Sequence, residues 1–159
     1  GQLGLGDTVK REKHVQMLVD GEFTAVACGA NHTVMLKNDG TVWVTGSNEF
    51  GQLGLGHTTD QTEPVQMKDV GTDNAAVACG WRHTAVLKKD GTVWVTGKNT
   101  DGQLGLEHTT NQTKPVPMPD VGDVKAVACG SYHTVMLKTD DTVWMAGTNR
   151  HTKPVKMEL

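Results

Sequence analysis

AVACGANHTVMLKNDGTVWVTG (Ala25–Gly46) is the first of three closely similar copies in this chain of 159 residues. The second copy, Ala76–Gly97, reads AVACGWRHTAVLKKDGTVWVTG, and the third, Ala126–Gly147, reads AVACGSYHTVMLKTDDTVWMAG. Steps of 51 and 50 residues separate them. Because several residue types recur with the same step, the chain is built from a repeated structural unit of about fifty residues.

Each copy predicts a β-hairpin. Val34–Lys37 and Thr41–Gly46 are rich in residues that favour strands, and Asn38–Gly40 lies between them. Glycine at such a turn accepts a positive φ without strain from a Cβ atom. The third copy has Asp140–Asp141 there instead, so we expect a strain of roughly 1 kcal/mol in that turn.

The side chains of these strands predict how the units pack. Thr41–Thr45 carries bulk on both faces, which is typical of a strand covered on both sides. The alternating alanines of AVACG suit the narrow space where strands crowd near an axis. A unit of about fifty residues with four short strands has the size of a propeller blade. We therefore predict an all-β fold made of β-propeller blades.

These motifs resemble a known repeat family. The repeat of this chain is similar to that of the regulator of chromosome condensation family. The similarity lies in the string CG, two residues, HT, then L, DGTVW, G and GQLGLG. It recurs three times and covers nearly the whole chain. The resemblance implies a β-propeller with one repeat per blade, seven blades being usual. It also implies candidate partners, since the best known member is a nucleotide exchange factor for the small GTPase Ran that docks on nucleosomes. Many other members are adaptors, so the resemblance indicates the fold more firmly than the activity.

We expect residues 1–159 to form one propeller segment. Its repeat units run approximately over 1–50, 51–101 and 102–159 and are circularly offset from the blades. Propellers have about four to eight blades, so three repeats make a partial ring.

The third unit is shorter than the others. Gly46 and Pro64 are 18 residues apart, whereas Gly147 and Pro154 are only 7 apart, so a third copy of GQLGLG is missing there. Three explanations are open: an excerpt from a longer propeller, two copies that join their open edges into six blades, or edges that pair with another protein. Since unpaired edges invite association, an isolated monomer is the least expected state.

The string GQLGLG is predicted to shape the backbone. It stands at Gly1–Gly6 and Gly51–Gly56, with the near copy GQLGLE at Gly102–Glu107. Its glycines are ordered G-x-x-G-x-G, and no helical pattern follows, so it does not match a loop that cradles phosphate. We expect the glycines to permit sharp turns where blades approach each other.

The histidine of each HT pair is expected to be structural. His32, His83 and His133 occupy equivalent positions of successive blades, so rotation about the axis keeps them apart. We predict that a partly buried imidazole and the neighbouring hydroxyl tie adjacent strands by hydrogen bonds. A metal site is not expected.

The cysteines are expected to be free, buried thiols. Cys28, Cys79 and Cys129 form no C-x-x-C pair, which argues against zinc. Unpaired thiols indicate a reducing compartment, and we predict a cytoplasmic or nuclear protein, with a virion or cell surface as the alternative.

Charge and motifs exclude several function classes. The net charge is -3, which favours neither nucleic acid nor an anionic membrane as partner, and no apolar run is long enough to insert into a membrane. No nucleophile, base and acid can be combined into a catalytic set; Asp39, Asp90 and Asp140 are turn residues. We expect no cofactor and no enzymatic activity.

Partner-binding residues are sought where the copies differ. The pairs before HT are Ala30–Asn31, Trp81–Arg82 and Ser131–Tyr132, and a second variable set follows TVWVTG at Ser47–Phe50, Lys98–Asp101 and Thr148–Arg150. Trp, Arg and Tyr are enriched at interface hot spots. The candidates are Asn31, Glu49, Phe50, Trp81, Arg82 and Tyr132. Whether both sets share one rim is open, and alternatively Trp81 covers a loop and Phe50 packs under GQLGLG.

Three functions follow. The first is a non-enzymatic interaction or scaffold module that binds a protein. The alternatives are a guanine nucleotide exchange factor for a small GTPase and a structural subunit of a larger assembly such as a virion, filament or surface complex. We expect either self-association or further blades in a longer chain.

Overall fold

Each repeat folds into a four-stranded antiparallel sheet, which we call a blade. The computed structural model describes residues 1–17, 19–148 and 151–158. Blade 1 contains β1 (Phe23–Cys28), β2 (His32–Lys37), β3 (Val42–Gly46) and β4 (Gln61–Gln66). Blade 2 contains β5 (Asn74–Cys79), β6 (His83–Lys88), β7 (Val93–Gly97) and β8 (Gln112–Pro117). Blade 3 contains β9 (Val124–Cys129), β10 (His133–Lys138), β11 (Val143–Gly147) and β12 (His151–Lys156).

The predicted hairpin turn is present in every blade. In blade 1 the Asp39 carboxylate accepts hydrogen bonds from the backbone N–H and the hydroxyl of Thr41, at 2.9 and 2.6 Å. Gly40 follows with φ +81°, and Asp141 takes the same left-handed region at φ +64°. Asp141 therefore has the unfavourable left-handed backbone conformation that the sequence predicts for this turn.

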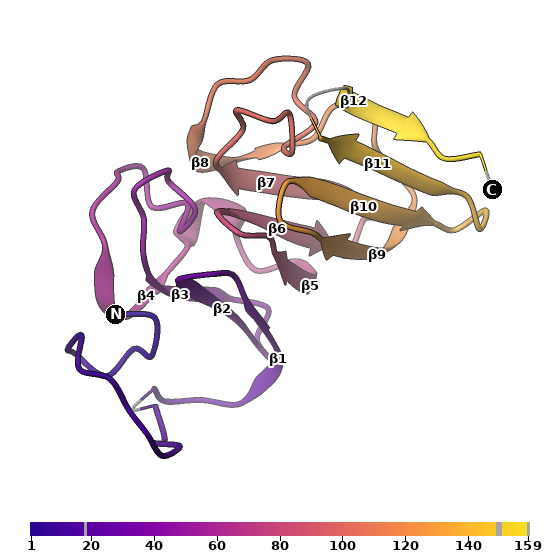
Figure 1. Ribbon diagram of the computed structural model, residues 1–159. Coiled ribbons are helices and arrows are strands. Elements are labelled where there is room, and N and C mark those ends of the chain that lie inside the picture. The colour runs from indigo at the N-terminus through magenta and orange to yellow at the C-terminus, as the bar shows by residue number, and fades with distance from the viewer. Residues whose placement is uncertain (18, 149–150, 159) are drawn as a thin grey trace.

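The blades are arranged as a fan. The first strands β1, β5 and β9 lie next to one another on its inner side, and the later strands of each sheet spread outward (Figure 1). The alanine-rich AVACG segments therefore occupy the crowded side, as predicted. The all-β architecture of propeller blades is confirmed.

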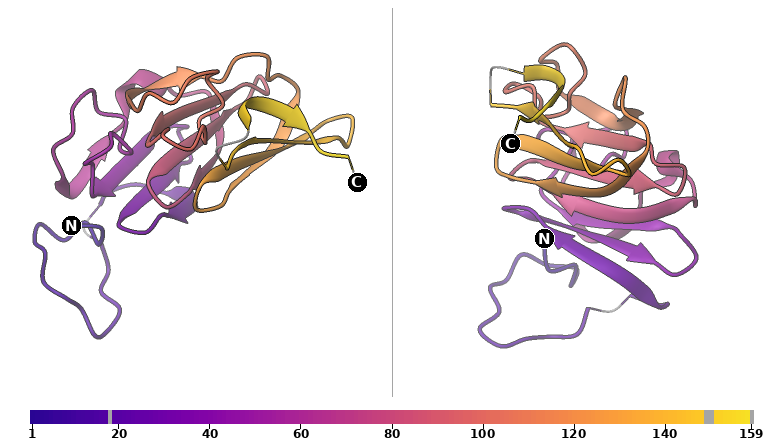
Figure 2. Two further views of the ribbon diagram at one scale, coloured as in Figure 1. Left: turned by 45° about the horizontal axis from the view of Figure 1, so that its top comes forward. Right: turned by 90° about the vertical axis from the view of Figure 1, so that its right-hand side faces the viewer.

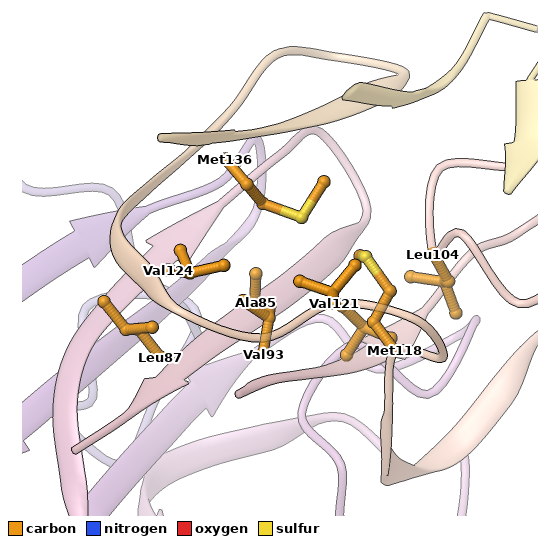
Figure 3. Packing of buried hydrophobic residues seen from close by; sticks show 9 residues of the cluster. Ala85, Leu87, Val93, Leu104, Met118, Val121, Val124 and Met136 are labelled. Carbon is orange, nitrogen blue, oxygen red and sulfur yellow. The ribbon is translucent and has the colours of Figure 1, made fainter. Parts of the chain in front are cut away.

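The hydrophobic core lies between blades, because each blade is a single sheet. One cluster joins Leu36 and Val42 of blade 1 to Val86 of blade 2, and a second joins Leu87 and Met136 across blades 2 and 3. Figure 3 shows this second cluster from close by. Each blade consequently depends on a neighbour to cover its apolar faces.

Residues 1–17 precede blade 1 and form no strand; they hang as a loop at one end of the fan (Figure 2). Their GQLGLG string nevertheless docks on blade 1, where the Gly6 N–H donates to the Thr62 carbonyl at 2.9 Å. In the same way Gly56 donates to Thr113 at 2.8 Å. The first string therefore lies against blade 1 as the second lies against blade 2.

Helix is nearly absent from the described residues. A 3-10 turn, η1 (Lys68–Val70), connects blade 1 to blade 2. In the part of the chain that the structure describes, no helix has the length and apolarity to cross a bilayer.

Candidate functional site

The GQLGLG string shapes the backbone, as predicted. Gly51, Gly54 and Gly56 have φ between +64° and +81°, and Glu107 takes φ +63° where Gly56 stands in the preceding copy. A Cβ at Gly51 would lie 2.6 Å from the Gln112 carbonyl oxygen of the next blade. The glycines therefore allow the loop of one blade to approach the backbone of its neighbour.

The HT pair links adjacent blades through a chain of hydrogen bonds, which we call the interblade relay. Thr84 of blade 2 donates its hydroxyl proton to the Gln52 carbonyl of the blade 1 loop at 2.7 Å. The Thr84 hydroxyl oxygen also lies 3.0 Å from Nε2 of His32. Because a hydroxyl has one proton, His32 must carry its proton on Nε2 and donate to Thr84.

The relay repeats between blades 2 and 3. His83 Nε2 lies 3.1 Å from the Thr134 hydroxyl, which donates to the Gln103 carbonyl at 2.7 Å. The predicted link between imidazole and hydroxyl is confirmed. The prediction that these rings are partly buried is wrong for His32 and His83, which are buried completely by the facing blade.

Burial fixes the protonation state of these rings. It lowers the pKa of His32 to about 4 and the pKa of His83 to about 3, because a charged imidazole loses its hydration there. Nδ1 of each ring has no hydrogen-bond partner among the described residues. Both imidazoles are therefore neutral and structural. In the same part of the chain, no group of three or more His, Cys, Asp or Glu side chains could hold a metal ion.

The sheet topology brings the two variable sets to one end of the blades. In a four-stranded antiparallel sheet, the connection between the first two strands and the connection between the last two lie at the same end. The pairs before HT occupy the first connection and the residues after TVWVTG occupy the second. The question left open by the sequence is settled: both sets share one rim. Asn149 and Arg150 lie outside the described residues.

Arg82 is the centre of this rim. Its guanidinium carbon lies 4.8 Å from the Phe50 ring centroid and 5.3 Å from the Trp81 ring centroid. A guanidinium nitrogen lies 3.7 Å from a carboxylate oxygen of Glu49. Residues from blade 1 and blade 2 therefore hold one cation between two aromatic rings and an anion.

A second aromatic contact extends the surface to blade 3. The Trp81 and Tyr132 rings meet edge to face, with centroids 5.3 Å apart and an interplanar angle of 72°. The Lys98 ammonium lies 5.4 Å from the Tyr132 ring centroid. Trp81 and Tyr132 remain 42% and 37% exposed. We call the set Glu49, Phe50, Trp81, Arg82, Lys98 and Tyr132 the rim patch.

The candidates chosen from the sequence agree with this geometry in five cases of six. Asn31 is exposed on blade 1, and within the described residues its side chain makes no hydrogen bond or ring contact with the rim patch. Lys98 was absent from the chosen candidates. Lys98 follows TVWVTG directly, as Ser47 does in the first copy. The difference between serine and lysine at this variable position is the signal by which the sequence could have identified Lys98.

A funnel of about 540 Å³ opens beside the rim patch. It is lined by small residues at the ends of the inner strands, with Trp81 and Tyr132 at its wall. Burial raises the pKa of Cys129 to about 12 and also raises the pKa of Cys79, so both stay protonated thiols at neutral pH. The prediction of buried thiols is wrong for Cys28, which is exposed, and holds only in part for Cys79 and Cys129, whose residues are partly exposed at the funnel.

Comparison with known proteins identifies the repeat. The family model described as "Regulator of chromosome condensation (RCC1) repeat" matches residues 1–36, 39–87 and 90–137. A second model with the same description matches 23–52, 75–103 and 124–152.

Curated relatives share this repeat within longer chains. The chain is 35% identical over 121 residues to the ultraviolet-B receptor UVR8 of Arabidopsis thaliana, covering 72% of this chain and 27% of that protein. It is 36% identical over 112 residues to the secretion-regulating guanine nucleotide exchange factor of Bos taurus, covering 68% of this chain and 24% of that protein. The chain thus spans about a quarter of these two relatives.

Solved structures share the fold. Prp20p from Saccharomyces cerevisiae, studied for its binding to Gsp1p and histones, superposes with a TM-score of 0.85 at 19% identity, over 99% of this chain and 44% of that one. Human WBSCR16 superposes with a TM-score of 0.83 at 23% identity, over 99% of this chain and 45% of that one. At this identity the likeness concerns the fold alone.

Proposed function

This chain belongs to the regulator of chromosome condensation (RCC1) repeat family, and we propose that it is a non-enzymatic protein-interaction module whose rim patch binds another protein. The observation that carries the proposal is the gathering of Trp81, Arg82, Tyr132 and Phe50 at one end of the blades. Aromatic rings and an arginine fixed against one another are the groups that dominate binding energy at protein interfaces.

The rim patch is separate from the features that hold the fold together. The interblade relay and both hydrophobic clusters are made by other residues. Trp81 and Tyr132 leave much of their ring surface to solvent, although burial of such rings is favourable. A partner that covers them would gain this burial without disturbing the sheets.

Charge on the patch favours a specific partner over a purely apolar one. Arg82 lies beside Glu49, and Lys98 lies 3.2 Å from Asp101, so each cation has an anion near it. Paired charges at the edge of aromatic rings fix the orientation of a partner more than they add affinity. We therefore favour a folded protein with both charges on its surface over nucleic acid or an anionic membrane.

A triple variant tests the patch. We expect Trp81→Ala, Arg82→Ala and Tyr132→Ala together to weaken partner binding at least 100-fold, since hot-spot truncations cost about 2 kcal/mol or more each. Proteins captured by the immobilised chain would be identified by mass spectrometry. The dissociation constant of a purified partner would then be measured by calorimetry.

The matched control is a triple variant at the other end of the blades, Thr72→Ala, Lys89→Ala and Thr139→Ala, all of which are exposed. It should bind like the wild type. Both variants should unfold at the wild-type temperature. Unchanged capture by the rim variant would reject the proposal, because its fold and its control would be intact.

A cellular location inside the cytoplasm or nucleus is part of the proposal. Cys28, Cys79 and Cys129 are free. Free thiols persist in reducing compartments. An extracellular location would contradict this part of the proposal and leave the rim patch unaffected.

Guanine nucleotide exchange is the second candidate, favoured by the similarity to the bovine exchange factor. The chain covers a quarter of that protein, so it offers only part of any face that the relative uses. The test is the release of a fluorescent guanine nucleotide from small GTPases. Release no faster than the spontaneous rate would remove this candidate.

A further inference from the structure

The rim patch joins the three blades by two contacts of the same kind. Between blades 1 and 2, the Arg82 guanidinium carbon lies 4.8 Å from the Phe50 ring centroid. Between blades 2 and 3, the Lys98 ammonium lies 5.4 Å from the Tyr132 ring centroid. The cation belongs to the following blade at the first junction and to the preceding blade at the second. A contact between a cation and a ring therefore recurs at both junctions, although the blades that supply the two groups are exchanged.

These contacts form one continuous run across the rim. Trp81 lies between them, with its ring centroid 5.3 Å from the Arg82 guanidinium carbon and 5.3 Å from the Tyr132 ring centroid. The order along the rim is Lys98, Tyr132, Trp81, Arg82 and Phe50. Lys98 therefore stands at the end of the run where the two exposed rings meet.

Lys98 also occupies the position at which blade 1 pairs a buried amide. Gln52 and Gln103 are the equivalent glutamines of the second GQLGLG and of GQLGLE, and they are 2% and 0% exposed. Nε2 of Gln52 donates to the Ser47 hydroxyl at 3.3 Å. Nε2 of Gln103 has no hydrogen-bond partner among the described residues, and Lys98, the counterpart of Ser47, carries donors only. The side-chain oxygens of the two glutamines do not differ in this way, since each accepts a backbone N–H, at 2.9 and 3.0 Å.

The unpaired amide of Gln103 reduces the stability of the fold, because a buried donor without an acceptor has lost its hydrogen bonds to water. Lys98 gains the Asp101 carboxylate, at 3.2 Å, and the face of the Tyr132 ring. Blade 1 nevertheless builds the same loop with a serine and with its glutamine paired. The fold therefore does not require a lysine at this position. Departures of this kind from the pattern that favours folding are expected at functional sites.

We propose that Lys98 is a positioning residue of the rim patch and is present there at a cost in stability. Its ammonium fixes the Tyr132 ring, and the edge-to-face contact with Tyr132 fixes Trp81, so that both rings are ordered before a partner arrives. Rings that are already ordered lose less conformational entropy on binding. The inference rests on the proposed function of the rim patch, whereas the order of the rings and the cost in stability are properties of the chain alone.

The order of the Tyr132 ring can be measured directly, because Tyr132 is the only tyrosine of the chain. A tyrosine ring labelled with carbon-13 gives its order parameter by NMR relaxation. Lys98→Ser should lower this order parameter. Lys98→Arg, which restores a cation over the ring, should keep the wild-type value. An order parameter that Lys98→Ser leaves unchanged would overturn the positioning role.

Thermal unfolding measures the cost in stability. Lys98→Ser gives Gln103 an acceptor and should raise the unfolding midpoint by about 2–4 °C, whereas Lys98→Arg should not, since arginine also lacks an acceptor. Ser47→Ala is the matched control in blade 1. It leaves Nε2 of Gln52 unpaired and should lower the midpoint, without any change at the Tyr132 ring. A midpoint lowered by Lys98→Ser would show that the lysine stabilises the fold and would overturn the proposal.

Binding separates this inference from the proposed function. The probe is a purified partner that the wild type binds and the rim triple variant does not. Lys98→Ser should raise its dissociation constant about 10-fold through the lost order of the two rings, while Lys98→Arg and Ser47→Ala should bind like the wild type. A Lys98→Ser chain that is more stable and binds as tightly as the wild type would overturn the positioning role and leave the rim patch in place. Unchanged binding by the triple variant would instead reject the proposed function, whatever the ring order and the midpoint of the free chain.

Discussion

At the scale of single residues, the repeated string CG-x-x-HT is explained by the interblade relay. Gly29 leaves room for the imidazole, since a Cβ there would lie 2.1 Å from Cε1 of His32. His32 reaches Thr84 of the next blade, and Thr84 reaches Gln52 in the loop of the first. The glycine, the histidine and the threonine of this string therefore recur together with the glutamine of GQLGLG. The glycine makes room for the imidazole, and the other three are joined by hydrogen bonds.

Removal of one hydroxyl should break this unit. Thr84→Val keeps the shape of the side chain but leaves the His32 N–H and the Gln52 carbonyl unpaired in a buried site. Each unpaired buried group costs about 1–3 kcal/mol, so for the two groups we expect a loss of about 2–6 kcal/mol in the free energy of unfolding. Urea denaturation measures it.

Thr33→Val is the matched control. Only the Gln2 carbonyl loses its donor there, and no described histidine is affected. The expected loss is about 1 kcal/mol. Equal losses in both variants would show that the histidine contributes nothing to the relay.

The buried histidines also predict how stability depends on pH. Unfolded histidine binds a proton below about pH 6.5, whereas folded His32 and His83 do so only below about pH 4 and 3. The unfolded state therefore gains protons first, and stability falls as the pH drops below 6.5. The fall is about 1.4 kcal/mol per pH unit for each histidine.

Urea denaturation between pH 7 and 4.5 checks this dependence. His83→Gln, although less stable at pH 7, should show a shallower fall because one of the two buried rings is gone. A stability that stays constant over this range would contradict the burial of neutral rings.

The sequence predicted that histidine and threonine join strands, yet the direction of the relay could not be read from it. Which blade supplies each partner depends on how the sheets stack, and the tautomer depends on the Gln52 carbonyl. The exposure of Cys28 could not be predicted for a similar reason: it depends on what packs against β1, while the AVACG string that contains Cys28 equals the one that contains Cys79.

At the scale of elements, the turn between the second and third strands is stabilised locally. Hydrogen bonds from the Thr142 hydroxyl and N–H lower the pKa of Asp140, and Asp39 and Asp90 have the same arrangement with their threonines. The residue after the aspartate then needs a positive φ. Glycine meets this need in two blades.

Asp141→Gly should therefore stabilise blade 3. Relief of the left-handed conformation, about 1–2 kcal/mol, exceeds the extra entropy that glycine loses on folding, about 0.5–1 kcal/mol. The loss of the exposed ion pair with Lys125 changes little. We expect a net gain of about 0.5 kcal/mol in thermal or urea unfolding.

The converse change provides the control. Gly40→Ala would place a Cβ 1.7 Å from the Thr72 carbonyl oxygen and should destabilise the protein by more than about 2 kcal/mol. If Asp141→Gly lowered stability, the left-handed backbone would not be the source of strain.

Hairpins were the most predictable elements because turn and strands are adjacent in sequence. The second strand begins two residues earlier than expected, at His32, since pairing with Gly46 extends it. Val15–Met17 repeats the VQM of Val65–Met67, yet only the second copy belongs to a strand-forming segment. A strand forms where a partner offers backbone groups: β3 pairs with β2 along one edge, and its other edge pairs with β4.

At the scale of the whole molecule, the repeated and the variable positions have different roles. The repeated positions build sheets and join them, with the core between blades. The variable positions gather at one rim. The repeat made the blades predictable, whereas the rim patch depends on contacts among three loops that are far apart in sequence.

A core between blades means that the blades stabilise each other. A single sheet has no second layer of its own, so a blade that loses its neighbour exposes apolar faces such as Val42 and Val44. Stability then resides in the junctions, as in other repeat proteins.

Unfolding followed separately in each blade tests this claim most directly. Trp43, Trp94 and Trp144 lie in blades 1, 2 and 3, so three variants that keep one of them and carry phenylalanine at every other tryptophan report on one blade each. For each variant, urea unfolding would be followed both by the fluorescence of its remaining tryptophan and by the strand signal in circular dichroism. Within each variant the two transitions should have the same midpoint. Blades that unfold at clearly different urea concentrations within one variant, with strand signal lost in steps, would contradict the account.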